Sequence, residues 1–450
     1  MKLKRLLCAA LAATIGMSVA ACGTPSDVKQ SSTANSETSS TQTTDGKTQI
    51  VVWTFQRHDM DYVTAMLDEY NKTNTDNIEV KLEVMSENFD TNLDLAFQSN
   101  QMPDVFRARV PMMSYIQKDM VSPIDEFMTD EEKALYGDTI GVERLNAYDG
   151  KLYTLPYTGS AYRLIYNKDI FEKAGLDPEA PPKTLSEVRE MSKIITEKLS
   201  GEGIYGTAMN LKSPSSGLNR SVDVIAEHSG VYPYNDETGK YDFTGYGEIL
   251  KVYADIYADG SFFPGAEGLD IDPLRAQFAQ GKIGMYLSGD WEIGVYADQF
   301  PTDVNWAAAE LPVLDGSTPQ PVRMSGAGYG WCISSQTKNP EAAWKVMQLF
   351  HDFDFQVGYS ENGYGFMTRE DVVAAAKPAE KYGSEYFVPG EMDTIKAPPP
   401  HSSGVVIEGD TFNDMGVAVI LGQKDADQCV QELNEKYNAA LEKAKAEGKY

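Results

Sequence analysis

Cysteine and histidine are scarce in this sequence. The 450 residues include four cysteines and four histidines, and both types are scattered along the chain. None of them has the spacing of a metal site, so we expect no metal and no other cofactor. The sequence also lacks a serine-histidine-acid order and a glycine-rich phosphate loop. It therefore carries no motif of a metalloenzyme, a serine hydrolase or a nucleotide-dependent enzyme.

Basic residues are also few. Lysine and arginine together number 39, against 67 aspartates and glutamates, and the formal net charge is −28. A chain this acidic is repelled by phosphate backbones and by anionic lipid headgroups. Nucleic acid and an electrostatically bound membrane surface are therefore not expected as partners.

The cysteines fall into two groups. Cys8 and Cys22 lie near the N-terminus, whereas Cys332 and Cys429 each lie in an apolar segment. The second pair could form a disulfide in an exported protein. Their apolar surroundings favour the alternative, which is two buried free thiols.

The N-terminus has the layout of an export signal. Lys2, Lys4 and Arg5 precede an uncharged apolar run over residues 6–21, which is too short to span a bilayer comfortably. The run ends in "VAAC", which resembles the lipobox of bacterial lipoproteins. The resemblance implies that Cys22 receives a diacylglycerol and further acyl chains such as palmitate, and becomes the new N-terminus. A plain secretory signal with an incidental cysteine is the alternative.

The segment after Cys22 lacks apolar residues. Residues 23–47 contain no aromatic side chain, and Val28 is their only branched aliphatic one. They cannot bury enough apolar surface to offset the chain entropy lost on folding. We therefore predict a flexible tether that holds a folded region near the membrane.

From Thr48 onward the patterns alternate between strand and helix. Residues 50–53 are a short apolar run, and residues 78–84 alternate apolar and polar side chains, as a half-buried strand does. Helical spacing of apolar residues over 60–70 separates them. Strands joined by helices of this length indicate an α/β fold with a mainly parallel sheet. About 400 residues are enough for two lobes with separate cores.

Two later helices have clear start signals. Thr184 and Glu187 have the spacing of a capping box. Asp272 is the expected N-cap of a second helix, and Gly281 is expected to end it in the left-handed conformation.

Four segments together resemble one family. Residues 164–188, 278–291, 338–350 and 361–369 are similar to the extracellular solute-binding proteins of carbohydrate ATP-binding cassette importers, of the maltose-binding type. The resemblance implies two α/β lobes joined by a hinge, with one carbohydrate ligand enclosed in the cleft between them. It also implies a monomer without enzyme activity that delivers its ligand to the permease subunits of an importer.

The resemblance suggests boundaries for these parts. The expected ranges are 1–21 for the signal peptide, 22–47 for the anchor and tether, 48–157 with 306–356 for the N-terminal lobe, and 158–305 with 357–450 for the C-terminal lobe.

Sugars need flat aromatic surfaces and polar groups that read their hydroxyls. By resemblance, Trp291 in "SGDW" is the stacking platform, with Asp290 beside it; a core tryptophan is the alternative. Tyr329 lies in the glycine-rich turn "SGAGYGW", where backbone can approach a ligand closely. Trp331 in the same stretch is expected to pack in the core.

The first lobe offers further candidates at the ends of its strands, where ligands bind in open α/β sheets. Phe55 and Gln56 follow the first strand, and Glu87 follows the second. Arg107 and Arg109 end the third strand and either reach the cleft or lie on the surface. Family members often have a tryptophan at the position of Arg107, so this chain departs from the pattern there.

Two further segments supply candidates near the crossings between the lobes. Tyr157 and Ser160 lie in the stretch 153–162, at the expected crossing. Tyr364 and Arg369 match a family segment near the cleft, although both could instead hold the hinge.

Two alternatives to transport binding follow from the same residues. A lipid-anchored glycoside hydrolase would also display aromatic side chains and carboxylates, and it needs two carboxyl groups flanking one bond. A polysaccharide adhesin would need a shallow platform and no enclosing hinge. The sequence favours an extracellular, lipid-anchored binding protein.

Overall fold

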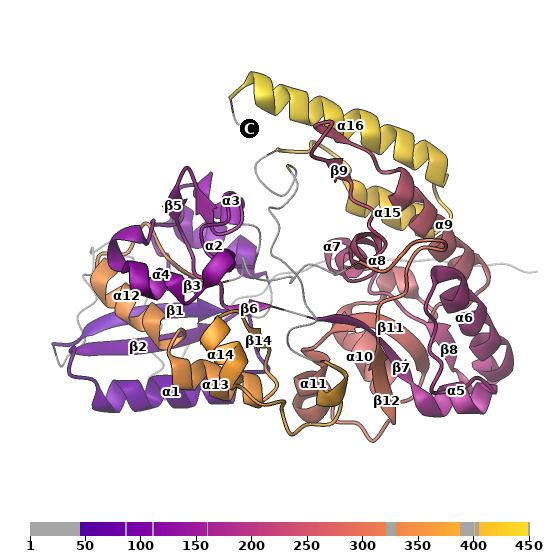
Figure 1. The fold of residues 1–450 in the computed structure, drawn as a ribbon, viewed down its shortest axis with the longest axis horizontal. Coiled ribbons are helices and arrows are strands. Elements are labelled where there is room, and N and C mark those ends of the chain that lie inside the picture. Colours follow the sequence, from indigo (N-terminus) through magenta and orange to yellow (C-terminus); the bar gives the residue numbers. More distant parts are fainter. Residues whose placement is uncertain are drawn as a thin grey trace, which may run out of the picture. The chain divides into compact units, whose positions relative to one another are not determined.

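The structure is a computed structural model that describes residues 46–85, 88–109, 112–159, 161–320, 330–387, 400 and 405–448. The expected signal peptide, Cys22 and nearly all of the tether lie outside the described residues. The described elements form two separate four-stranded sheets with helices packed against them (Figure 1).

The first sheet has the strand order β13-β3-β1-β2. Strand β1 (Thr48–Thr54) runs parallel to β2 (Ile78–Val84) on one side and to β3 (Val105–Arg107) on the other. Strand β13 (Trp331–Ile333) closes the sheet antiparallel to β3. The predicted strands over 50–53 and 78–84 are therefore confirmed.

Helices cover both faces of this sheet. Val105 and Phe106 alternate between two hydrophobic clusters, one on each face. The first cluster includes Trp331 and Phe350, whose rings stack with centroids 3.8 Å apart, so the expected core position of Trp331 is confirmed. The helices of this part are α1 (Met60–Thr73), α2 (Phe89–Gln98), α3 (Met112–Ile116), α4 (Asp130–Ala134), α12 (Pro340–Leu349), α13 (Phe353–Glu361) and α14 (Glu370–Ala375).

The second sheet has the order β12-β7-β11-β8. Strand β7 (Tyr162–Asn167) pairs antiparallel with both β11 (Ile283–Gly289) and β12 (Trp306–Ala309). Only β8 (Tyr205–Thr207) runs parallel to its neighbour β11. The prediction of a mainly parallel sheet thus holds for the first sheet and is wrong for the second.

The second sheet is also buried on both faces. Leu164 and Ile165 point into different hydrophobic clusters. The longer helices around it are α5 (Lys168–Ala174), α6 (Leu185–Leu199), α9 (Thr244–Ala258), α10 (Ile271–Ala279), α15 (Phe412–Ile420) and α16 (Ala426–Ala446). The shorter elements are α7 (Pro214–Leu218), the π-helix η4 (Asn219–Asp223), α8 (Val224–His228), α11 (Glu292–Gly294), the π-helix η6 (Val295–Gln299) and the hairpin β9–β10 (Tyr234–Asn235, Lys240–Tyr241). The hairpin β4–β5 (Ala147–Tyr148, Lys151–Leu152) belongs with the first sheet, because Leu152 packs in its core.

The capping box of α6 is confirmed: the Thr184 hydroxyl accepts from the Glu187 N–H, and the Glu187 carboxylate accepts from the Thr184 N–H. The prediction for α10 is wrong at its start. Its N-cap is Asp270, whose carboxylate accepts from the backbone of the next residue, and Asp272 lies in the first turn. Gly281 has φ +68°, as expected after a helix end.

A short two-stranded sheet lies where the chain passes between the two larger ones. Strand β6 (Thr158–Gly159) precedes β7, and it pairs antiparallel with β14 (Phe366–Met367). Strand β14 follows α13, whose residues Phe355 and Tyr359 pack in the core of the first sheet.

Two segments differ from the expected boundaries. Strand β12 within 306–309 joins the second sheet, although this range was expected in the N-terminal lobe. Residues of 357–372, including Tyr359, Met367 and Val372, pack in the core of the first sheet, although they were expected in the C-terminal lobe. Packing of apolar side chains determines both differences, since each segment buries its apolar residues on the sheet it contacts.

Cys332 and Cys429 are free and buried, as favoured from the sequence. Burial raises the pKa of the Cys332 thiol to about 12 and that of Cys429 to about 11. Within the described ranges, no group of histidine, cysteine and carboxylate side chains has the arrangement of a metal site. No helix in the described part of the chain is long and apolar enough to cross a membrane.

Candidate functional site

Trp291 follows the end of β11 and is half-buried. The Tyr162 ring meets its indole edge to face, with centroids 5.4 Å apart. A Cβ atom at Gly289 would come within 2.4 Å of the indole, so only glycine leaves room for the ring there. The indole N–H donates to Glu292 Oε1 at 2.9 Å. These contacts fix the ring at the end of the strand.

Glu292 is fully buried beneath this ring. Its Oε1 also accepts from the Ser288 hydroxyl at 2.7 Å and from Arg275 Nη2 at 2.7 Å. Arg275 adds hydrogen bonds from Nε to both carboxylate oxygens. The carboxylate thus has its acceptor positions filled, as a buried charge requires.

Arg220 lies over the Trp291 ring. Its guanidinium carbon is 5.1 Å from the ring centroid, within the range of a cation–π contact. The Nη1 atom is buried, and no hydrogen bond reaches it from the described residues. Burial, followed by the nearby charge of Arg275, lowers the pKa of Arg220 from its usual value. Arg220 comes from the π-helix η4, and π-helical turns occur often at functional sites.

Asp290 is a buried carboxylate beside Trp291. Its Oδ1 accepts from the Ala161 N–H at 2.9 Å, and its own N–H donates to the Ala161 carbonyl. Burial raises the pKa of Asp290 to about 7, against an ordinary value of 3.8. Asp290 lines a pocket together with residues of the β14 region and the following segment, among them Gly365, Phe366, Ser384 and Phe387.

The strand ends of the first sheet bring three of the predicted residues together. Arg107 and Arg109 place their guanidinium carbons 5.8 and 5.7 Å from the centroid of the Phe55 ring. The Arg109 side chain is 46% exposed, whereas Arg107 is buried. Gln56 follows Phe55 and is half-buried, with its backbone N–H donating to the Thr54 hydroxyl.

The guanidinium of Arg107 contacts three neighbouring side chains. Its Nη2 donates to the Thr158 hydroxyl at 2.9 Å, and its Nη1 lies 3.5 Å from the Asp59 carboxylate. Its guanidinium carbon is 4.9 Å from the centroid of the Tyr157 ring. Tyr157 itself is fully buried, so the structure places its side chain in the core of the first sheet and not on an exposed surface.

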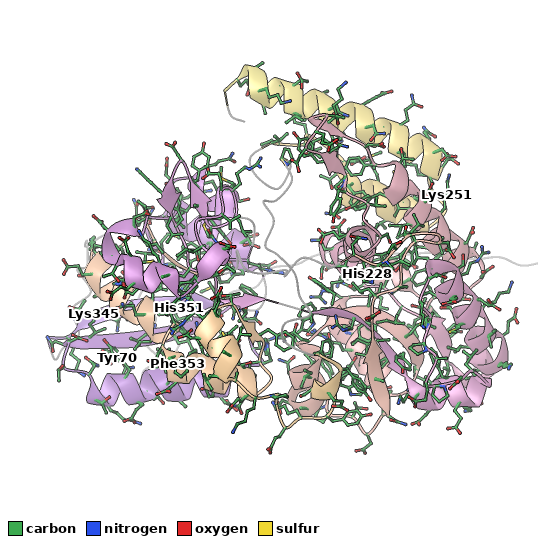
Figure 2. All side chains as sticks on the ribbon, viewed as in Figure 1. Tyr70, His228, Lys251, Lys345, His351 and Phe353 are labelled. Carbon is green, nitrogen blue, oxygen red and sulfur yellow. The ribbon has the colours of Figure 1, made fainter. Side chains whose placement is uncertain are left out.

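Tyr364 and Arg369 occupy different surroundings. Tyr364 is half-buried, its carbonyl oxygen is 3.1 Å from His58 Nε2, and the Lys381 ammonium lies 4.9 Å from its ring centroid. Arg369 is buried; it donates to Asp371 and to the carbonyl of His351, and it lies over Phe353. His351 and Phe353 are labelled in Figure 2, at the start of α13. These partners fill the guanidinium, which favours a structural role for Arg369.

Three predicted residues, Glu87, Ser160 and Tyr329, lie outside the described residues. Sequence reasoning missed Arg220, Tyr162 and Glu292, which surround Trp291. Glu292 directly follows the quoted motif and could have been included. Arg220 carries no local signal of a binding role, because it is one polar residue in a helical segment whose apolar side chains pack in the core.

The solved structures similar to this chain share its fold over most of its length. A solute-binding protein of an ABC transporter from Thermotoga lettingae, bound with α-D-tagatose, has a TM-score of 0.71 at 22% identity and covers 87% of this chain and 99% of its own. The maltose/maltodextrin-binding domain MalE of Bdellovibrio bacteriovorus, bound to maltotriose, has a TM-score of 0.68 at 17% identity, with 88% and 99% covered. The fold is therefore the two-lobed α/β fold of periplasmic sugar-binding proteins.

Sequence comparison identifies the family. The model of the bacterial extracellular solute-binding protein family matches residues 56–350, and the chain belongs to this family. A binding protein of Brucella abortus is 27% identical over 259 residues, which span 56% of this chain and 58% of that relative. The sn-glycerol-3-phosphate-binding periplasmic protein UgpB of Agrobacterium fabrum is 27% identical over 315 residues, which span 66% and 68%. The chain thus spans less than two thirds of the length of the first of these relatives.

Proposed function

We propose that this protein captures a carbohydrate between its two lobes and delivers it to the permease of an ABC importer. The observation that carries the proposal is the family match, joined to a partly exposed tryptophan that is fixed at a strand end of the second sheet. A sugar ring has apolar C–H faces that pack on such a ring and hydroxyls that bind nearby polar groups.

The proposed site combines residues from both sheets. Trp291 and Asp290 contribute from the end of β11 in the second sheet. Phe55, Gln56, Arg107 and Arg109 contribute from the first sheet, together with Tyr364, which packs against its core. Glu87, Ser160 and Tyr329 remain proposed members of the site. Tyr157 is left out because its ring packs in the core of the first sheet, and Arg369 because Asp371 and the His351 carbonyl fill its guanidinium. Arg107 is kept because its Nε and Nη1 atoms have no hydrogen bond among the described residues.

Ligand capture is proposed to occur by hinge closure. The segments of β6 and β14 connect the two sheets, so rotation there would bring the two sets of side chains to opposite sides of one ligand. The ligand stabilises the closed state by its differential affinity for it, and the permease then recognises that state. We propose lobe boundaries that follow the packing, with 306–309 in the second lobe and 353–375 in the first.

We further propose that the protein is a monomer anchored by a lipid on Cys22 at the outer face of the cell membrane. The charged start, the apolar run and "VAAC" support this assignment. Lipid would hold a protein of this acidity where electrostatic attraction cannot.

A thermal-shift screen tests the ligand class. The named ligands of the similar structures, α-D-tagatose, maltotriose and mannotriose, form its core, with sn-glycerol 3-phosphate included because of the UgpB relatives. A ligand at 100 times its Kd stabilises the folded state by about 2.7 kcal/mol, which is easily detected. A shift with sugars supports the proposal, and a shift with glycerol 3-phosphate alone would replace it. Release of reducing sugar by the purified protein would indicate a glycoside hydrolase.

A further inference from the structure

The side chain of Arg220 is half-buried and forms no ion pair with a carboxylate among the described residues. It packs on the Trp291 ring, and its Nη1 atom has neither solvent exposure nor a hydrogen bond there. Folded proteins pair almost all buried charges, because an unpaired one loses its hydration without compensation. The described residues therefore supply no hydrogen-bond acceptor for the Nη1 atom of Arg220.

The nearest carboxylates do not fill this role. Glu292 Oε1 accepts hydrogen bonds from Ser288, Trp291 and Arg275, and its Oε2 accepts from Arg275 Nε, so its ion-pair partner is Arg275. Asp272 is shared between two other arginines, at 3.3 Å from Arg275 Nη1 and 2.9 Å from Arg57 Nη2. Asp290, beside Trp291, accepts from the Ala161 N–H, so none of these three carboxylates forms an ion pair with Arg220 in the described part of the chain.

The arginines near Trp291 make the site locally positive, whereas the whole chain is strongly acidic. Arg220 and Arg275 lie close to the same tryptophan, and Arg275 pairs with Glu292 and Asp272 whereas Arg220 has no such pair among the described residues, in a protein whose formal net charge is −28. Such an acidic protein gives anions no long-range attraction. An anionic ligand would therefore depend on a local cation at the site.

We propose that Arg220 is the subsite for an anionic group of the ligand, so that the ligand is an acidic sugar. The inference rests on the proposed function and specifies its substrate class. The shared chemistry is an oxyanion, either the carboxylate of a uronic acid or a phosphate ester, on the sugar unit beside Trp291. A guanidinium suits both, because its planar N–H groups bind carboxylate and phosphate in the bidentate mode.

The surroundings prepare Arg220 for this role. The Trp291 ring supports the guanidinium from one side, and Glu292 and Tyr162 hold that ring in turn. A side chain ordered before binding loses less conformational entropy when the ligand arrives. The π-helical turn Asn219–Asp223 that carries Arg220 is of a rare kind that occurs often at functional sites.

Calorimetric titration of matched ligands tests the proposal. The pairs are galactobiose with digalacturonate, mannobiose with dimannuronate, and glucose with glucose 6-phosphate, and sn-glycerol 3-phosphate is added alone. We expect at least one acidic member to bind roughly 10- to 100-fold tighter than its neutral partner, as hydrogen bonds to a charged group contribute. The uronate and phosphate arms distinguish the two sources of the oxyanion.

Arg220→Met should abolish this preference, because a thioether cannot bind an oxyanion through charge-assisted hydrogen bonds. Arg189→Met is the matched control, since Arg189 pairs with Asp255 and Asp259 on the surface; it should keep the preference. Arg220→Lys keeps the charge without the fork and should give an intermediate value. If Arg220→Met does not fold, the wild-type preference and Arg220→Lys decide the question.

Three outcomes would overturn the inference. Neutral sugars that bind as tightly as their acidic partners would remove the acidic-sugar class while leaving the proposed function intact. An Arg220→Met protein that is folded and keeps its preference would show that another group binds the anion. Binding of no sugar of either kind would reject the proposed function itself, and the present inference with it.

Discussion

Replacing Asp290 by asparagine should make the free energy of unfolding depend less on pH between about pH 4 and pH 7. The folded-state pKa of about 7 lies about 3 above the ordinary value of 3.8. The folded protein therefore holds this proton more tightly than the unfolded chain does. Below about pH 4 both states are protonated and the folded state carries no penalty. As the pH rises to about 7 the penalty grows to about 4 kcal/mol, at ~1.4 kcal/mol for each pKa unit.

The asparagine variant should keep the local structure. Its side-chain oxygen can accept from the Ala161 N–H as the carboxylate does, and it carries no charge that burial would disfavour. The assay is urea unfolding of wild type and variant at intervals from pH 4 to pH 8. The difference between their free energies of unfolding should change by about 4 kcal/mol in favour of the variant as the pH rises. Asp303→Asn, at an exposed aspartate, is the control and should give parallel curves. Parallel curves for Asp290→Asn would refute the buried-carboxylate argument.

Further predictions concern the tryptophans and the cysteines. Trp291→Ala should weaken sugar binding by at least ~1 kcal/mol, measured by calorimetry, with the fold retained. Trp331→Ala, in the core against Phe350, should instead lower the free energy of unfolding by about 3–5 kcal/mol. If both changes lowered the stability equally and neither changed sugar affinity, Trp291 would not belong to the site. Cys22→Ala should release the protein from the membrane fraction, and a variant that stayed there after signal removal would contradict the anchor. Cys332 and Cys429 should react with a thiol reagent at neutral pH only after unfolding, because burial keeps both protonated; fast labelling of the native protein would show that they are accessible.

The strands of the first sheet and the start of helix α6 could be predicted well because their signals are local. The alternation of Ile78, Val80 and Leu82 and the capping box at Thr184 each involve residues within a few positions of one another. The pairing of the second sheet could not, since β7 and β11 are separated by several helices and no local pattern fixes the direction in which they meet. The α10 cap was misplaced because "LDIDPL" offers two aspartates, and the earlier one, Asp270, makes the capping bond.

The candidate site could be predicted in part. Asp290 and Trp291 follow from a short motif at a strand end, and Phe55 with Arg107 follows from the rule that ligands bind beyond strand ends. The sequence could not show that Tyr157 turns into the core or that Arg369 is held by Asp371, because both depend on tertiary packing. For the same reason it gave no indication that Arg220, far upstream in the chain, covers the Trp291 ring.

Small-angle X-ray scattering with and without ligand tests the central claim most directly. The ligand is the sugar that raises the unfolding temperature most, added at a concentration that saturates the site. Enclosure between two lobes predicts a smaller radius of gyration and a shorter maximum dimension in the saturated protein, because hinge closure brings the lobes together. Trp291→Ala should need a sugar concentration at least about fivefold higher for the same change in scattering, in line with a loss of ~1 kcal/mol or more in binding. A wild-type protein that binds the sugar by calorimetry and scatters unchanged would contradict capture by closure and favour an open binding platform.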